Sequence, residues 1–150
     1  MLLNEFILKA KQNTYASSGV GGDILLSDNS KEFSYEEGGF KYKDKYYGHN
    51  PFIGEEIVWQ DNKIIWGMNY YGEVVSDIVP VKEVYAFLKT VLRKVEIDRP
   101  FRGPREYKNA DWKYINNNTG DVNNFSGREI IYYKDIKVYE LVYHGGVIKK

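Results

Sequence analysis

Apolar and polar residues alternate along the chain in two patterns, first at helical and then at strand spacing. Leu3, Phe6, Ile7 and Ala10 fall three or four positions apart, which predicts an amphipathic helix. A second helix is predicted after Pro80, since proline is favoured in a first helical turn. Its apolar positions are Val84, Phe87, Leu88, Val91, Leu92 and Val95.

Runs of alternating apolar and polar residues follow each predicted helix and are typical of β-strands. The first half has four such runs, at residues 32–36, 40–46, 52–60 and 63–71, and the clearest runs of the second half are 112–116, 124–133 and 136–144. Asp61-Asn62 is a two-residue hairpin signal, and Lys134-Asp135 occupies the same place in the second half. Alternation also predicts that Trp66, Met68 and Tyr70 share a buried face.

The two halves resemble each other in sequence. Residues 52–72 align without gaps on residues 125–145 at an offset of 73, and residues 34–42 match residues 106–114 at an offset of 72. We therefore expect a single α+β domain over residues 1–150 that is internally duplicated as residues 1–75 and 76–150. Each half would be a helix plus an antiparallel β-meander, an α-β4-like unit, and pseudo-twofold symmetry would relate the halves. Alternatively, the matches reflect only the residue preferences that β-hairpins share.

Composition narrows the possible partners. The 150 residues carry 21 basic and 21 acidic side chains, so no net charge favours direct nucleic-acid binding or a membrane surface. No cysteine and only two histidines are present, which gives metal binding little support and implies no cofactor. No leader or apolar span stands out, so a cytoplasmic protein is expected. The 14 tyrosines favour strands and recognition surfaces.

Several short motifs resemble the bacterial domain of unknown function 5680 (DUF5680). They are Thr14-Tyr15-Ala16, Tyr46-x-Gly48, Phe52-x-Gly54-x-Glu56, Trp66-x-Met68-x-Tyr70-x-Gly72, Phe101-Arg102-Gly103-Pro104, Phe125-x-Gly127-x-Glu129 and Val138-Tyr139 with Tyr143-His144-Gly145-Gly146. The resemblance implies a regulatory role, because that domain often follows the helix-turn-helix of Xre-type regulators. We expect no helix-turn-helix in this sequence, because residues 1–12 predict a single helix. The resemblance is compatible with three roles, namely a detached sensor, a component of a two-protein system, and a phage or mobile-element protein that sequesters a signal.

Charge is uneven between the halves, and all five arginines lie in the second. Three of them fall in the proline-stiffened segment 99–105, where Arg102 and Arg105 are candidates to bind an anion through their guanidinium groups. The segment that follows the first predicted helix is rich in serine and glycine. Its Thr14, Tyr15, Ser17 and Ser18 could supply hydroxyl and backbone N–H donors. The alternative for the arginines is a solvated connector with ordinary ion pairs.

Aromatic and polar residues on the face opposite Trp66 could frame the rest of a ligand. Asn69 and Tyr71 lie on this face of one hairpin, with His144 on the hairpin of the second half, and they complete the predicted ligand-binding set. Glu56 and Glu129 occupy matching strand positions, which suggests a catalytic pair. Partners of lysine or arginine are the simpler interpretation, and no catalytic residue is assigned.

The sequence thus favours a non-enzymatic domain that senses or sequesters a small, anionic, nucleotide-like ligand between its halves. One alternative is a protein–protein interaction module for a regulator or a defence protein, and homo-oligomerisation stays open. A second alternative is a hydrolase of a similar ligand that uses His144 with Glu129 or Glu56.

Overall fold

The computed structural model describes residues 1–14 and 24–149. Its elements in chain order are α1 (Leu3–Gln12), β1 (Ile24–Leu25), β2 (Lys31–Glu37), β3 (Phe40–Gly48), β4 (Phe52–Gln60), β5 (Lys63–Val74), α2 (Val81–Leu92), β6 (Glu106–Asn109), β7 (Trp112–Asp121), β8 (Asn124–Tyr133) and β9 (Ile136–Val147). Two helices with a large antiparallel sheet fit the expected α+β class, with a strong excess of strand.

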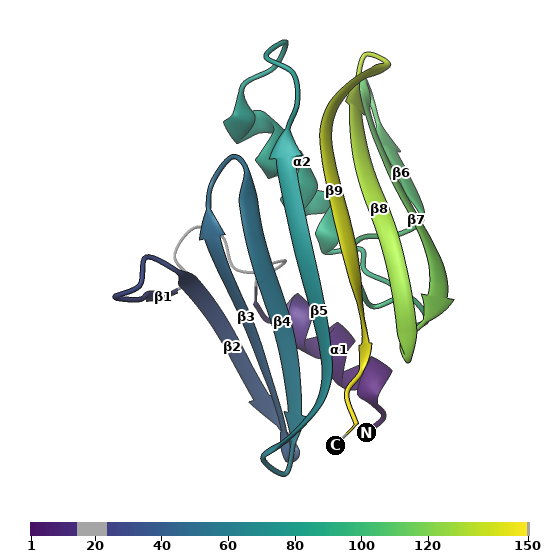
Figure 1. The fold of residues 1–150 in the computed structure, drawn as a ribbon. Coiled ribbons are helices and arrows are strands. Elements are labelled where there is room, and N and C mark those ends of the chain that lie inside the picture. The colour runs from purple at the N-terminus through teal and green to yellow at the C-terminus, as the bar shows by residue number, and fades with distance from the viewer. Residues whose placement is uncertain (15–23, 150) are drawn as a thin grey trace.

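The nine described strands form one sheet in the order β1-β2-β3-β4-β5-β9-β8-β7-β6. Strands β2 to β5 make one meander and β6 to β9 a second, and the two join edge to edge where β5 pairs with β9 (Figure 1). This pairing sets Tyr70 opposite Tyr143 and Asn69 opposite His144. Residues from the two halves therefore become neighbours at the centre of the sheet.

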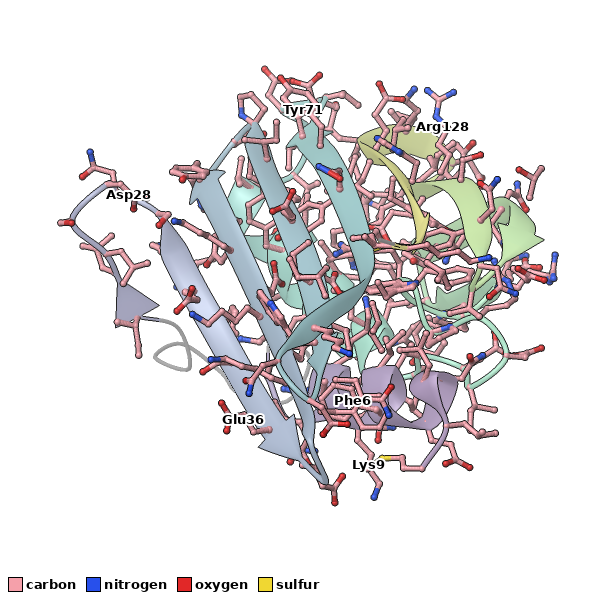
Figure 2. All side chains as sticks on the ribbon, turned by 60° about the horizontal axis from the view of Figure 1, so that its bottom comes forward. Phe6, Lys9, Asp28, Glu36, Tyr71 and Arg128 are labelled. Atoms are coloured by element: carbon pink, nitrogen blue, oxygen red, sulfur yellow. The ribbon has the colours of Figure 1, made fainter. Side chains whose placement is uncertain are left out.

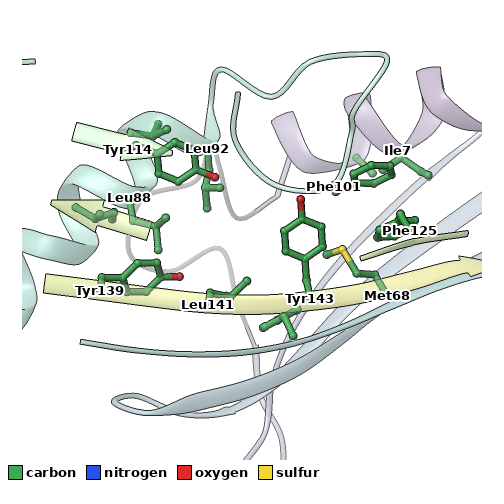
Figure 3. Close-up of a cluster of buried hydrophobic side chains, with 14 of the residues drawn as sticks. Ile7, Met68, Leu88, Leu92, Phe101, Tyr114, Phe125, Tyr139, Leu141 and Tyr143 are labelled. Carbon is green, nitrogen blue, oxygen red and sulfur yellow. The ribbon is translucent and has the colours of Figure 1, made fainter. Parts of the chain in front are cut away.

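Both helices lie on one face of the sheet (Figure 1). Helix α1 turns Phe6 towards the strands, where its ring stacks on Phe40 with centroids 4.9 Å apart, and directs Lys9 outwards (Figure 2). Helix α2 buries the predicted positions from Val84 to Leu92. The predicted inward face of β5 is confirmed, because Trp66 and Met68 are fully buried and Tyr70 nearly so. Side chains from β9 and the helices fill the space between the two layers (Figure 3).

The predicted hairpin turns are confirmed. Asp61, Asn62, Lys134 and Asp135 all have positive φ angles between 48° and 65°, as a type I′ turn requires. One hairpin strand shifts register between Val58 and Trp59 on β4, and its counterpart shifts between residues 131 and 132 on β8. Both hairpins therefore carry a bulge at the same distance from the turn.

The strands extend beyond their predicted ends. Strand β5 continues to Val74, β7 to Asp121 and β9 to Val147, and β6 adds an outer strand to the second meander. Polar and glycine residues at these ends break the apolar alternation, although backbone pairing continues through them.

Candidate functional site

A pocket of about 100 Å³ opens between the first meander, helix α2 and the segment after α2. Its lining residues are Lys31, Asp44, Tyr46, Gly48, His49, Phe52, Tyr70, Tyr85 and Arg102. Tyr85 belongs to α2 and Arg102 to the segment after it, whereas the other lining residues come from the first half. The pocket therefore lies where the two halves of the chain meet. We call it the Asp44–Arg102 pocket.

A smaller cavity of about 20 Å³ shares Asp44 and Arg102 with this pocket. It is also lined by Lys11 and Thr14 at the end of α1 and by Glu56 on β4. Asp44 and Arg102 thus contact two neighbouring spaces, and the described side chains that line the smaller one are all buried.

Two buried ion pairs surround these spaces. Lys11 Nζ lies 2.8 Å from Glu56 Oε1 and also donates a hydrogen bond to the Phe101 carbonyl. Arg102 Nη2 donates to Glu129 Oε1 at 2.7 Å, while Arg102 Nε lies 3.2 Å from both carboxylate oxygens. Burial lowers the pKa of Lys11, and the Glu56 carboxylate acts against this shift. Since an unpaired buried charge is costly, each pair depends on both of its members.

Tyrosine hydroxyl groups complete the polar network. Tyr70 donates to Asp44 Oδ1 at 2.5 Å, and Tyr143 donates to Asn116 Oδ1 at 2.7 Å. Residues 44 and 116 are related by the offset of 72 and the two tyrosines by the offset of 73. The same hydrogen bond therefore occurs in each half, with a carboxyl as acceptor in the first and an amide in the second.

Asp44 is the unusual acid of the network. It lies directly across from Glu56 in the pairing of β3 with β4, and both side chains are buried. Burial and the nearby Glu56 carboxylate raise the pKa of Asp44 to about 7. The Asp44 carboxyl therefore changes protonation state close to neutral pH.

Aromatic rings form much of the pocket wall. The Arg102 guanidinium carbon lies 5.5 Å from the centroid of the Tyr70 ring, within cation–π range. The Phe52 and Tyr85 rings pack edge to face at 5.9 Å. Tyr85 also donates a 2.5 Å hydrogen bond to the His49 carbonyl. The wall is thus held in place by contacts between β4, α2 and the segment around His49.

The structure brings only part of the predicted ligand-binding set to this region. Arg102 lines both cavities, and Thr14 lines the smaller one, where its hydroxyl donates to the Ala10 carbonyl. Arg105 is exposed, and its backbone N–H donates to Glu96. Tyr15, Ser17 and Ser18 lie outside the described residues.

The remaining predicted residues lie on the other face of the sheet. Asn69, Tyr71 and His144 are exposed there, while Tyr70 and Tyr143 beside them point to the helices. Strand alternation thus separates these three side chains from Arg102, and the predicted set does not form one site. His144 is separated from the fully buried Glu129 in the same way, so the two do not form an acid–base pair.

Sequence reasoning missed Asp44, Lys31, His49, Phe52 and Tyr85 as lining residues. A signal for Asp44 was present, because alternation along β3 places it on the buried face between Tyr42 and Tyr46. A carboxyl at an inward position marks a buried polar site. The contribution of Tyr85 depends on how α2 packs, which strand periodicity does not reveal.

Residues 1–14 and 24–149 contain no group of three or more histidine, aspartate or glutamate side chains placed to hold a metal ion. Within the same part of the chain, no helix has the length and apolarity needed to span a bilayer.

Comparison with known proteins gives one match. Neither the curated proteins nor the solved structures include one that matches this chain. A family model described as a domain of unknown function, DUF5680, matches residues 44–148. The matched part includes all of the sheet from Asp44 onwards together with α2 and Arg102. The chain therefore belongs to the DUF5680 family.

Proposed function

We propose that this chain is a non-enzymatic domain that senses or sequesters a small, anionic, nucleotide-like molecule in the Asp44–Arg102 pocket. The observation that supports it most is an incompletely used guanidinium group. Glu129 accepts hydrogen bonds from Nε and Nη2 of Arg102, whereas Nη1 donates to none of the residues that the structure describes. A guanidinium group with an unused edge beside a pocket suits a carboxylate or phosphate group.

The size of the pocket indicates how such a molecule would sit. Pockets for drug-sized ligands occupy roughly 300–1,000 Å³, so about 100 Å³ fits only the anionic group. The planar part would then rest at the opening against Phe52 and Tyr85. Stacking on aromatic rings contributes about 1–3 kcal/mol per base. Lys31 supplies a second cation, and it has no ion-pair partner among residues 1–14 and 24–149.

We also infer that the chain arose by internal duplication and that pseudo-twofold symmetry relates its halves. The repeated tyrosine hydrogen bonds, the equivalent bulges and the shared order of elements support this. The related positions 44 and 116 differ in one respect. Asp44 gives the first half an ionisable carboxyl group, whereas Asn116 gives the second half an amide.

Calorimetric titration with inorganic phosphate, AMP and cyclic AMP tests the proposal. We expect at least one of them to bind, Lys31→Ala and Phe52→Ala to weaken binding, and Lys63→Ala to leave it unchanged. Lys63 is a matched control because it is an exposed lysine at the start of β5, away from the pocket. Absence of binding at high micromolar concentrations, or equal affinities for Lys31→Ala and Lys63→Ala, would reject the proposal.

A second candidate function uses the face of the sheet away from the helices. Ile53, Tyr71 and Val142 lie opposite one another on β4, β5 and β9, and each is about half exposed, at 53%, 50% and 54%. This apolar row fits contact with a partner protein such as a regulator or a defence protein. Tyr71→Lys should abolish co-elution with such a partner while leaving cyclic AMP binding unchanged, and retained co-elution would count against this surface.

A further inference from the structure

The charged groups around the Asp44–Arg102 pocket do not balance. Lys11 is paired with Glu56, and Arg102 is paired with Glu129. Asp44 has no cationic partner within 4 Å among the described residues, and the Tyr70 hydroxyl is the one group that donates to it there. Two cations and three carboxyl groups are thus buried together, and Asp44 is the carboxyl left without a counter-ion.

The side chains around Asp44 come from β3, β4, β5, α1 and the segment after α2. Glu56 on β4 is its direct cross-strand partner, and like charges at such a position repel. Tyr42 on β3 and Tyr70 on β5 are buried close by, and burial raises the pKa of each phenol, so both stay neutral. Lys11 from α1 and Arg102 are the cations that face Asp44.

Two further groups line the same pocket at a larger distance from this cluster, namely Lys31 on β2 and His49 after β3. The test of this proposal therefore includes a variant of His49 beside one of Asp44.

We propose that Asp44 takes up one proton from solvent when an anion binds in the pocket, so that its neutral carboxyl group donates an O–H hydrogen bond to the anion. This inference rests on the proposed function and deepens it, because it identifies Asp44 as the residue that selects an anionic ligand. The proton enters from water, no covalent bond forms or breaks in the ligand, and the Tyr70 hydroxyl continues to donate to Asp44 Oδ1.

The expected pH dependence follows from this exchange. The pKa of Asp44 in the free protein is raised to about 7 by burial and by Glu56, and a bound anion would raise it further. The dissociation constant should therefore be nearly constant below this pH and increase about tenfold per pH unit well above it. An ionised Asp44 that accepts hydrogen bonds from a cationic or N–H-rich ligand would give the opposite dependence.

Cyclic AMP is the most informative probe, because a phosphodiester has no ionisation near pH 7, whereas the second pKa of a phosphomonoester is about 6. Its binding should be measured calorimetrically at several pH values in buffers that differ in ionisation enthalpy. For the wild-type protein we expect uptake of about half a proton near pH 7, rising towards one proton at higher pH.

Two variants show which residue takes up the proton when the ligand binds. Asp44→Asn should bind with no proton uptake and a dissociation constant independent of pH, whereas His49→Gln should retain the wild-type uptake. Asparagine is compatible with the site, because Asn116 accepts the equivalent hydrogen bond from Tyr143. This inference alone is overturned if the ligand binds without proton uptake, if binding releases protons, or if proton uptake persists in Asp44→Asn. Failure of cyclic AMP, AMP and phosphate to bind overturns the proposed function instead.

Discussion

Arg102 holds Glu129 through a buried, forked ion pair, with Nη2 2.7 Å from Oε1 and Nε 3.2 Å from both oxygens. The hydroxyl groups of Tyr114 and Tyr139 donate to the same carboxylate at 2.5 and 2.7 Å. One carboxylate thus connects β7, β8, β9 and the segment after α2, and it fixes the position of the guanidinium group that lines the pocket.

Replacing Glu129 should therefore damage the fold severely. Glu129→Gln leaves the Arg102 charge buried without its partner, which costs about 3–5 kcal/mol. Glu140→Gln is the matched control on the adjacent strand, because Glu140 pairs with Arg128 and Lys137 near the surface. Its loss should cost less than about 1 kcal/mol. Urea unfolding of both variants measures the difference, and equal effects would show that the buried pair has no special importance.

Asp44 should make stability depend on pH. The folded protein keeps the Asp44 proton up to about pH 7, whereas the unfolded chain releases it near 3.8. Folded molecules bind more protons between these values, so the free energy of unfolding falls as pH rises, by up to about 1.4 kcal/mol per pH unit. Asp44→Asn should lose this slope. Chemical unfolding at pH 5, 6, 7 and 8 tests the prediction, which fails if both proteins show the same slope.

Substitution of either of two glycines should destabilise the fold, because a tyrosine ring packs directly against each of them. A Cβ atom at Gly54 would lie 2.2 Å from the Tyr70 hydroxyl, and one at Gly127 would meet Tyr143 at the same distance. Alanine at either position should cost at least about 1–3 kcal/mol through overpacking. Gly67→Ala is the control, since its Cβ would first meet the flexible end of Ile57 at 3.0 Å. Thermal unfolding that ranks Gly67→Ala as the most harmful would contradict this packing.

The tyrosine hydrogen bond of the second half can be tested without the charge of Asp44. Tyr143→Phe removes the donor to Asn116 Oδ1 and leaves a buried amide oxygen unsatisfied, at a cost of about 1–3 kcal/mol. Tyr71→Phe, on the exposed face of the sheet, should change stability by less than about 0.5 kcal/mol. Denaturant midpoints of the two variants provide the measurement, and similar midpoints would argue against a structural role for this hydrogen bond.

Local pattern predicted much of the sheet. Alternation along β5 placed Trp66, Met68 and Tyr70 in the core, and the dipeptides at residues 61–62 and 134–135 identified both hairpin turns. Side-chain period and turn geometry depend on neighbouring residues, which a single sequence contains. The ends of β7 and β9 were missed, because backbone pairing there continues through residues such as Asn117 and Gly146 that do not alternate in polarity.

The candidate site could be predicted only in part from the same local sequence pattern. The segment of Arg99, Arg102 and Arg105 reads as a surface loop, yet Arg99 and Arg102 are buried and only Arg105 is exposed. Glu129 was correctly interpreted as a partner of arginine, but that partner comes from the segment after α2 and not from a neighbouring strand. Burial of a charged side chain depends on partners that only the three-dimensional packing brings together.

The place of β9 affects how this sheet forms during synthesis. It is the last of the nine strands to leave the ribosome, yet it pairs with β5 on one side and β8 on the other. Until β9 emerges, the first meander exposes the β5 edge and the second exposes the β8 edge, and an unpaired strand edge invites association with other chains. Nascent chains that stall before residue 136 should therefore be the species most dependent on chaperones.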